Sequence, residues 1–410
     1  MSIGQRPSPP PSVSSLPRKK RRNRLLIGLL VLLLLFLLIG SGLFAFLNTR
    51  TAGPVAADQF VGHAYFESSG QFIENSTNGL NDELHLIMHS IPGPASGKSY
   101  YLWLLSDRTQ KPVVSIALGT VAVNHGTIDS LYVTPKHTNL IATTSRLLIT
   151  EESTTPAPVN FSFNKNTWRY YAEIPQTFPS PGAPHRGALT YLRFLLFESN
   201  KLAIQGLHGG HALRLLRNTQ KVLEWSGSAR DEWDLKNYGL MHRHFIRILE
   251  YLDGSAFASA DLPRGTSLLV NPLLAQNGLI TVVPGENPEA YSPRVAFSVL
   301  SFAQAANHLS PERRQMALDV EKDIRVNIEY RLQLVRRDAK QLLAMSDTQL
   351  AQPSILPLLN DMLTQANYAY AGQFDSATGR LVGGALNDYN SIQVLASFDV
   401  VPCPGSQCTL

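Results

Sequence analysis

The feature that most constrains this chain is an unbroken apolar run at residues 25–47, preceded directly by a basic cluster. The run has no charged side chain. As a helix rising ~1.5 Å per residue, it covers the ~30 Å hydrocarbon layer of a bilayer. Backbone groups in lipid must be satisfied within the segment, so it must be helical. Because basic residues stay on the cytoplasmic side, the pattern predicts a single-pass cell-membrane protein with a cytoplasmic N-terminus and an extracytoplasmic C-terminal bulk.

A cleaved signal peptide is the alternative interpretation of the same run, with small residues at 55–57 as a cleavage site. Signal peptides have apolar regions of only ~7–15 residues, so the length favours an anchor. Residues 1–24 are rich in proline, serine and basic residues, which predicts a disordered basic cytoplasmic segment. Its basic end is expected to contact membrane lipid.

The formal charge of +5 does not indicate a nucleic-acid-binding protein. Seven of the 36 basic residues lie before residue 25, which leaves 29 against the 31 acidic ones. The basic excess therefore belongs to the predicted anchor. The partners expected from the sequence are membrane lipid and another envelope or regulatory protein, with no nucleic acid.

Residues 59–158 contain short runs of β-branched and aromatic residues, bounded by Gly, Pro, Asn and Asp. The clearest runs lie at 60–66, 84–88, 100–105, 113–123 and 145–150. Repeated strands at short spacing, without helical patterns between them, predict a β-sandwich or a small barrel. The β-sandwich is the domain expected here.

Part of this region resembles a known family. Tyr-Tyr-Leu-Trp-Leu-Leu-Ser-Asp stands at 100–107, Ser-Ile-Ala-Leu-Gly-Thr at 115–120, Leu-Leu-Ile-Thr-Glu-Glu at 147–152 and Thr-Thr-Pro-Ala-Pro at 154–158. These motifs resemble the extracytoplasmic, C-terminal domain of anti-sigma-K factors, over roughly 60–158. The resemblance implies a regulatory sensing or binding region. The family's cytoplasmic sigma-binding domain has no counterpart in residues 1–24, so inhibition of a sigma factor is not implied.

Residues 159–187 are expected to form a linker, and 188–402 an all-α helical-bundle domain. The helices predicted from apolar periodicity and capping residues span 189–196, 212–233, 239–253, 292–307, 310–345 and 354–371. The predicted fold is thus a membrane-anchored, multi-domain chain. It has one N-terminal transmembrane helix, a β-sandwich and then the helical domain.

Candidate chemistry is limited to histidines in the predicted bundle: His208, His211, His242 and His244. They raise the alternative of a membrane-tethered metal- or haem-binding bundle. The two glycines between the first pair disfavour a shared helical face, and the second pair projects to opposite flanks of its helix. No nucleophile motif supports a hydrolase acting on envelope material, a third hypothesis. The sequence therefore predicts a non-catalytic binding protein, with no cofactor and no catalytic residue.

The C-terminal tail, 403–410, contains the chain's two cysteines, Cys403 and Cys408, around a Pro-Gly turn. Outside the cytoplasm such a close pair predicts a short disulfide loop; two free thiols are the alternative. We expect the intact mass of protein recovered from an oxidising compartment to show alkylation of both cysteines only after reduction. Alkylation without reduction, or zinc retained by the thiols, would contradict the disulfide.

Overall fold

The computed structural model describes residues 60–70, 76–176, 187–285, 289–306, 309–377 and 379–403. These residues belong to one compact unit, Asp58–Leu410. The predicted segments 1–24 and 25–47 lie outside the described residues. Within the described ranges, no helix combines the length and the apolar character that a membrane crossing needs.

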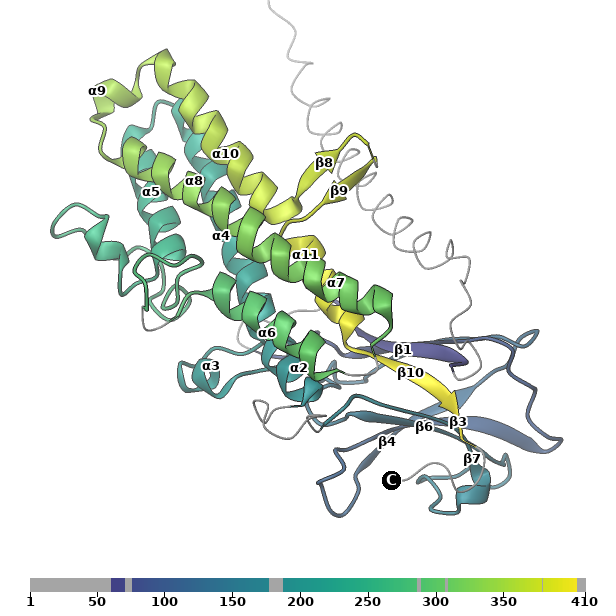
Figure 1. The fold of residues 1–410 in the computed structure, drawn as a ribbon. Coiled ribbons are helices and arrows are strands. Elements are labelled where there is room, and N and C mark those ends of the chain that lie inside the picture. The colour runs from purple at the N-terminus through teal and green to yellow at the C-terminus, as the bar shows by residue number, and fades with distance from the viewer. Residues whose placement is uncertain are drawn as a thin grey trace, which may run out of the picture. The chain divides into compact units, whose positions relative to one another are not determined.

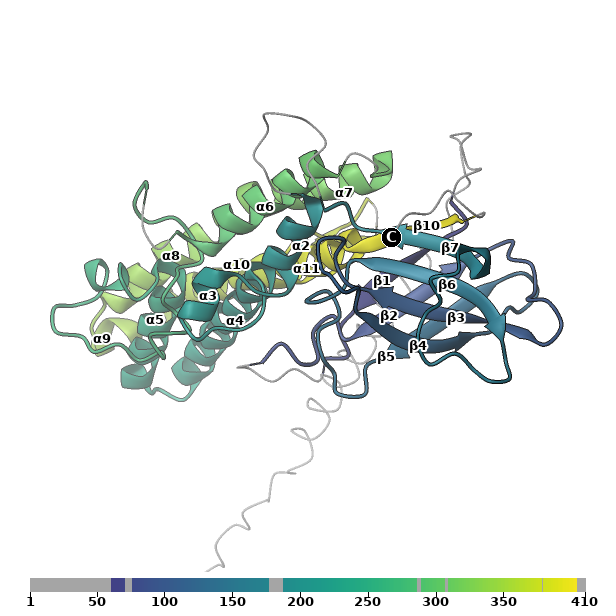
Figure 2. The same ribbon diagram turned by 90° about the horizontal axis from the view of Figure 1, so that it is seen from below.

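The described strands form one eight-stranded sheet, in the order β4-β3-β6-β7-β10-β1-β2-β5, and a separate hairpin of β8 and β9. All pairings in the large sheet are antiparallel. Figures 1 and 2 show this sheet beside the helices. The strands are β1 (Gly62–Glu67), β2 (Glu83–Met88), β3 (Lys98–Leu105), β4 (Ser115–Val121), β5 (Ile128–Val133), β6 (Arg146–Ser153), β7 (Trp168–Glu173), β8 (Gln373–Asp375), β9 (Arg380–Val382) and β10 (Ser397–Pro402).

The last strand in the sequence, β10, lies in the interior of the large sheet. It pairs with β1, where Val400 faces Gly62, and with β7, where Val401 faces Tyr171. In Figure 1 it is the yellow arrow that enters the sheet from the helical part. The C-terminal strand thus joins the β4-β3-β6-β7 half to the β1-β2-β5 half.

The helical part lies between β7 and β10 in the sequence. Its helices are α2 (Ala188–Leu196), α3 (Asn200–Ile204), α4 (His211–Asp234), α5 (Tyr238–Asp253), α6 (Tyr291–Ala305), α7 (Pro311–Lys322), α8 (Glu329–Leu343), α9 (Asp347–Leu350), α10 (Leu356–Ala371) and α11 (Ala385–Leu395). A π-helical turn, η3 (Asp323–Ile328), joins α7 to α8. Short 3₁₀ turns are η1 (Lys165–Thr167), η2 (Ala258–Ala260) and η4 (Pro353–Ile355).

Local sequence signals account for the ends of several helices. The Ser310 hydroxyl accepts from the Arg313 backbone N–H, and Pro311 occupies the first helical position of α7, as the sequence predicts. Gly254 and Gly372 end α5 and α10 with φ values of 80° and 85°. Residues other than glycine rarely adopt such values. The predicted helices at 239–253 and 354–371 are confirmed within the usual uncertainty of helix ends.

One face of the sheet shares a continuous hydrophobic core with the helices. Phe66, Leu102 and Phe398 from the sheet belong to the same buried cluster as Leu192 of α2 and Ile392 of α11. The opposite face of β3, β6 and β7 is covered by a smaller cluster. Its members are Tyr101, Trp103, Leu105, Leu148, Phe161, Trp168, Tyr171 and Cys403. Six of these residues belong to the three strands, and Phe161 and Cys403 pack against them, so β3 is buried on both faces.

The predicted fold class is therefore wrong. There is no β-sandwich followed by an all-helical domain in the described residues, because one sheet takes strands from both sides of the helical region. The stretch 159–187, expected to be a linker, contains β7, and the stretch 188–402, expected to be all-α, contains β8, β9 and β10. The membrane-spanning helix of the predicted fold class has no counterpart in the described part of the chain.

Side-chain hydrogen bonds connect the helices to the sheet region, and those of Arg193, Gln393 and Arg313 are examples. Arg193 of α2 donates to both carboxylate oxygens of Asp107, just after β3, at 2.6 and 2.8 Å. Gln393 of α11 donates to the Ser68 hydroxyl at 2.6 Å. Arg313 of α7 donates to both oxygens of Asp399 in β10, at 2.8 and 2.9 Å.

We expect Arg313→Ala to lower the free energy of unfolding by on the order of 3 kcal/mol, because Asp399 would stay buried without its cationic partner. The two side chains are only 14% and 19% exposed, so solvent screens this pair in part only. Chemical denaturation followed by circular dichroism measures the change. Arg325→Ala is the matched control, since Arg325 pairs with Glu321 while 62% exposed. It should cost less than about 1 kcal/mol, and equal losses in both variants would contradict the role of Arg313.

Candidate functional site

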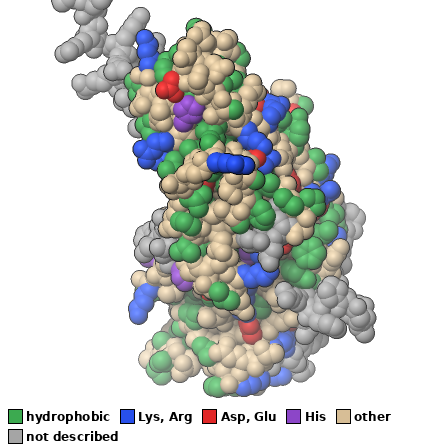
Figure 3. All heavy atoms as spheres, turned by 90° about the vertical axis from the view of Figure 1, so that its left-hand side faces the viewer, with side chains coloured by type: hydrophobic (Ala, Val, Ile, Leu, Met, Phe, Trp, Pro, Cys, Tyr) green, Lys and Arg blue, Asp and Glu red, His purple; other side chains and the backbone are tan. Residues whose placement is uncertain are grey.

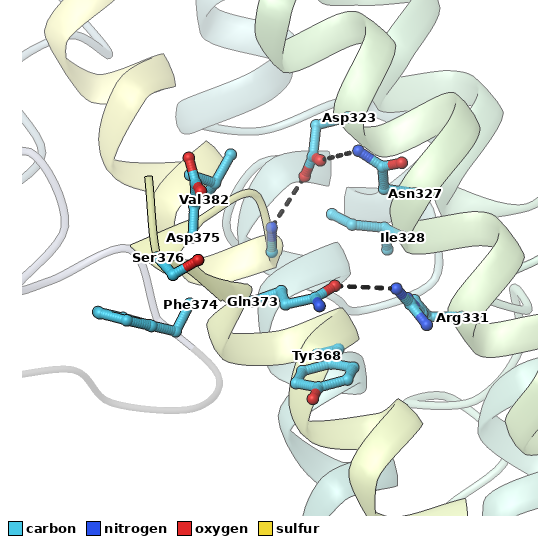
Figure 4. A pocket seen from close by; sticks show the side chains of 11 residues that line it. Asp323, Asn327, Ile328, Arg331, Tyr368, Gln373, Phe374, Asp375, Ser376 and Val382 are labelled. Atoms are coloured by element: carbon cyan, nitrogen blue, oxygen red, sulfur yellow. Dashed lines mark hydrogen bonds between the residues drawn. The ribbon is translucent and has the colours of Figure 1, made fainter. Parts of the chain in front are cut away.

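A pocket of about 450 Å³ lies where the β8–β9 hairpin meets the helices. This volume is within the roughly 300–1,000 Å³ typical of small-molecule pockets. Its walls come from η3, α8, α10, the hairpin and the start of α11, as Figure 4 shows. The lining residues are Asp323, Asn327, Ile328, Arg331, Tyr368, Gln373, Phe374, Asp375, Ser376, Val382 and Gly384. Most of these side chains are polar, which favours a polar ligand.

Arg331 is the cation of the pocket. Its Nη1 donates to Gln365 Oε1 at 2.8 Å, and its Nη2 donates to Gln373 Oε1 at 3.1 Å. The guanidinium lies 5.1 Å from the ring centre of Tyr368 and 5.8 Å from that of Tyr330. Figure 4 shows Arg331 and Gln373 reaching toward each other. The guanidinium is therefore held in place by neutral amides and aromatic rings.

The π-helical turn η3 brings Asp323 and Asn327 into the pocket wall. Asn327 Nδ2 donates to Asp323 Oδ1 at 2.6 Å, and the Gly384 backbone N–H donates to Asp323 Oδ2 at 2.8 Å. Gly384 caps the N-terminus of α11. A carboxylate is favourable there, because the free N–H groups of a helix start carry partial positive charge. π-turns are rare and frequently occur at functional sites.

A second carboxyl, Asp388 of α11, lies buried beside Asp323. Burial raises the pKa of Asp388 well above its usual range, and the neighbouring Asp323 carboxylate raises it further. Burial beside a second carboxylate therefore disfavours the charged form of Asp388.

Glycines let the hairpin start and end against the helices. A Cβ at Gly372 would lie 2.2 Å from the carbonyl oxygen of Gly383, and a Cβ at Gly383 would lie 2.4 Å from Asp323 Oδ1. Both glycines also have positive φ. A side chain at Gly383 would therefore clash with Asp323 of η3, and one at Gly372 would clash with the backbone at the other end of the hairpin.

Two of the predicted histidine candidates flank the start of α4 without meeting at a common site. His208 Nδ1 lies 3.0 Å from Glu198 Oε1. His211 is buried, its Nε2 lies 2.8 Å from the Ser199 hydroxyl and its ring stacks on Phe194 at 4.1 Å. Burial, aided by the charges of nearby basic residues, lowers the pKa of His211 to about 2, so its ring is neutral.

The other two candidates lie on α5 and face different neighbours. His242 Nε2 is 3.3 Å from Asp347 Oδ1 of α9, whereas the His244 ring stacks on Trp225 of α4 at 5.3 Å. Burial and the Arg247 charge lower the pKa of His244. In the part of the chain that is described, no group of three or more His, Cys, Asp or Glu side chains is placed to hold a metal ion.

Cys403 is buried in the outer cluster of the sheet, and its backbone N–H donates to the Arg169 carbonyl at 2.7 Å. Cys408 lies outside the described residues, so the Cys403–Cys408 disulfide stays a prediction.

Ser69, His137 and Asp82 bring together the residue types of a hydrolase triad, although the sequence gives no sign of this. The Ser69 hydroxyl donates to Asp82 Oδ2 at 2.7 Å, and His137 Nδ1 contacts the same oxygen at 2.6 Å. The Ser69 hydroxyl lies 3.4 Å from that same Nδ1. In a triad the serine faces the other imidazole nitrogen, so this arrangement does not activate a nucleophile.

Asp82 instead holds local structure. Burial raises its pKa, but hydrogen bonds from the Ser69 backbone and hydroxyl and from His137 outweigh burial and leave the pKa below its usual value. Asp82 therefore stays ionised, as expected of a carboxylate that accepts several hydrogen bonds.

One surface view shows how charge is spread. On the face in Figure 3, Lys and Arg side chains lie dispersed among hydrophobic and uncharged ones. A nucleic-acid-binding surface gathers its basic residues on one face or along one stripe. The described side chains in this view show no such concentration.

The pocket residues were missed in the sequence because helical periodicity marks the buried stripe of a helix, whereas Asp323, Asn327 and Arg331 lie on its flanks. A local signal was present: two short segments, Gln-Phe-Asp at 373–375 and Arg-Leu-Val at 380–382, are bounded by Gly372, Gly379 and the Gly383–Gly384 pair. Such glycine-bounded runs indicate a hairpin.

Comparisons with family models, with curated proteins and with solved structures found no match for this chain. The resemblance of 60–158 to the anti-sigma-K extracytoplasmic domain therefore stays a prediction.

We expect Asp388→Asn to preserve or raise the free energy of unfolding near neutral pH, because an amide of similar size replaces a carboxyl whose charged form is disfavoured by burial. The folded-state pKa of Asp388 lies above its unfolded value of about 4. The wild type therefore loses stability as pH rises from there toward the folded-state pKa, and the variant does not. Denaturation at a series of pH values should show that the free energy of unfolding of the variant increases relative to that of the wild type as pH rises.

Asp323→Asn is the matched exchange for this experiment. It removes the carboxylate that accepts the Gly384 N–H, and should lower the free energy of unfolding by about 1–3 kcal/mol. If Asp388→Asn destabilised the protein as much as Asp323→Asn, Asp388 would have to be ionised in the folded state.

Proposed function

We propose that this protein is a non-catalytic binding protein of regulatory type, and that the pocket at the β8–β9 hairpin is its ligand site. The observation that carries the proposal is the fixed Arg331 guanidinium in a pocket of small-molecule size. A preformed concave site with a few positioned polar groups is the usual form of a ligand pocket.

The rim of the pocket supports a binding role. Phe374 and Val382, which line the pocket, are each more than half exposed. Aromatic side chains at a pocket mouth offer large contact areas at a low entropic cost, because only two side-chain torsions are fixed on binding. The site thus combines one oriented charge with apolar contact surface.

The hydrogen bonding of the pocket carboxylates supports binding rather than catalysis. Both oxygens of Asp323 already accept hydrogen bonds from the chain itself. Asp375 Oδ1 accepts the Ala377 backbone N–H within the hairpin turn, at 2.9 Å. A general base needs a lone pair directed at its substrate, whereas these three oxygens accept hydrogen bonds from the Asn327 side chain and from two backbone N–H groups.

The connection of the site to the sheet supports a regulatory role. Gly384 lines the pocket and caps α11, and α11 ends at Leu395, just before β10 begins at Ser397. A ligand that moves the start of α11 would act on a rigid helix that leads directly into the interior of the sheet. A sensor needs such a physical link between its site and a distant element.

Ligand-observed NMR against a mixed library of small carboxylates, phosphates, amines and neutral sugars tests the proposal. We expect the wild type to bind members of this library and Asn327→Trp, which fills the pocket from η3, to lose them. Arg325→Trp is the matched control, because Arg325 lies on the same turn, is largely exposed and does not line the pocket. Loss of binding in both variants, or in neither, would place the ligand site elsewhere.

A further inference from the structure

Arg331 differs from most other buried or half-buried arginines of this chain in its partners. Arg193, Arg313 and Arg336 each pair with a carboxylate. Among the described residues, no carboxylate lies within ion-pair distance of Arg331, and its side chain contacts two amide oxygens and two tyrosine rings. Its charge is therefore not neutralised by a described side chain.

The hydrogen-bonding capacity of Arg331 is also only partly used. A guanidinium has five N–H donors in a rigid planar fork. The two contacts with Gln365 and Gln373 use one donor on each terminal nitrogen. The remaining donors keep the geometry that binds carboxylate and phosphate oxygens in pairs.

The aromatic rings make this position rigid. Stacking over Tyr368 holds the plane of the guanidinium, while the amide bonds fix its rotation. A cation that is already oriented loses little conformational entropy when it binds, so more of the interaction energy appears as affinity. The same rings offer a surface on which an aromatic or apolar ligand body can lie.

We propose that the pocket binds a small organic acid, whose carboxylate or phosphate is held by Arg331 and whose apolar part lies against Tyr368 and Phe374. This inference rests on the proposed ligand site and names the chemistry that the site selects. Asp323 opposes such a ligand only weakly, since both of its oxygens already accept hydrogen bonds, from Asn327 and from the Gly384 backbone. Figure 4 shows Asp375 at the hairpin side of the pocket, away from Arg331.

Because the carboxylate of Asp375 also lines the pocket, a cationic ligand is the main alternative. The test therefore compares probes that differ only in their polar group. Benzoate, phenyl phosphate, benzyl alcohol and benzylamine share one phenyl ring and carry a carboxylate, a phosphate, a hydroxyl and an ammonium. Their dissociation constants for the wild-type chain are measured by ligand-observed NMR titration. We expect benzoate or phenyl phosphate to bind more tightly than the alcohol and the amine, and their order tells which oxyanion the site prefers.

The variants connect this preference to Arg331. Arg331→Gln should raise the dissociation constant of the bound anion about tenfold or more, since hydrogen bonds to charged groups contribute about 1.5–3 kcal/mol. It should change benzyl alcohol binding by less than about twofold, a difference below 0.5 kcal/mol or so. Arg331→Lys keeps the charge without the fork and should fall between the two. Arg325→Gln is the control on the neighbouring turn, and circular dichroism confirms that each variant is folded.

The possible failures are distinguishable. If benzylamine or benzyl alcohol binds best and Asn327→Trp abolishes it, the pocket is a ligand site but the inference of an anionic ligand is wrong. If the anions bind equally well to wild type and Arg331→Gln, Arg331 does not hold them and the inference is likewise wrong. If none of the four probes binds the wild type, the inferred organic-acid class is rejected. The mixed-library experiment with Asn327→Trp then decides the ligand site itself.

Discussion

The arrangement of this protein depends on the contact between Arg313 and Asp399. Arg313 projects from α7 and donates to both oxygens of Asp399, and also to the carbonyl oxygens of Leu395 and Ser397. These carbonyls mark the end of α11 and the start of β10. One guanidinium therefore fixes a helix, a helix–strand junction and an interior strand at the same time. His63 of β1 approaches the same carboxylate at 2.9 Å, which extends the network to the next strand.

The electrostatics of that contact explain why it is specific. Burial lowers the pKa of Arg313, and the Asp399 charge opposes the shift. Burial raises the pKa of Asp399, but the hydrogen bond with His63 and the charge of Arg313 bring it below its usual value. The contacts with His63 and Arg313 together favour the ionised form of Asp399, and loss of Arg313 would leave this buried carboxylate without its arginine partner. The sheet and the helical part therefore depend on each other at this point.

The same constraint positions the candidate site. With β10 held in the sheet, α11 has a fixed C-terminus, and its N-terminal cap, Gly384, is presented to Asp323. The hairpin at 373–382 follows α10 and precedes α11. The glycines at its two ends, Gly372 and Gly384, allow these two stretches of backbone to lie in close contact. The pocket thus lies where the start of α11 meets the π-helical turn η3. The other end of α11 leads into the interior strand β10. Ligand binding there would act on elements that the Arg313–Asp399 contact connects to the sheet.

The sequence by itself determined the local elements: β1, β2, β3 and β6 from their apolar runs, and α4, α5 and α10 from periodicity. These features depend on neighbours a few residues away, through side-chain period, N-caps such as Ser310 and C-terminal glycines such as Gly372. Only the tertiary structure decided that β10 completes the sheet, because His63 and Asp399 meet across 336 positions of sequence. It also decided that Asp323, Arg331 and Gln373 share a pocket. Backbone hydrogen bonds are alike for every strand, so the choice of partner rests on packing and on buried charge, which act between distant residues.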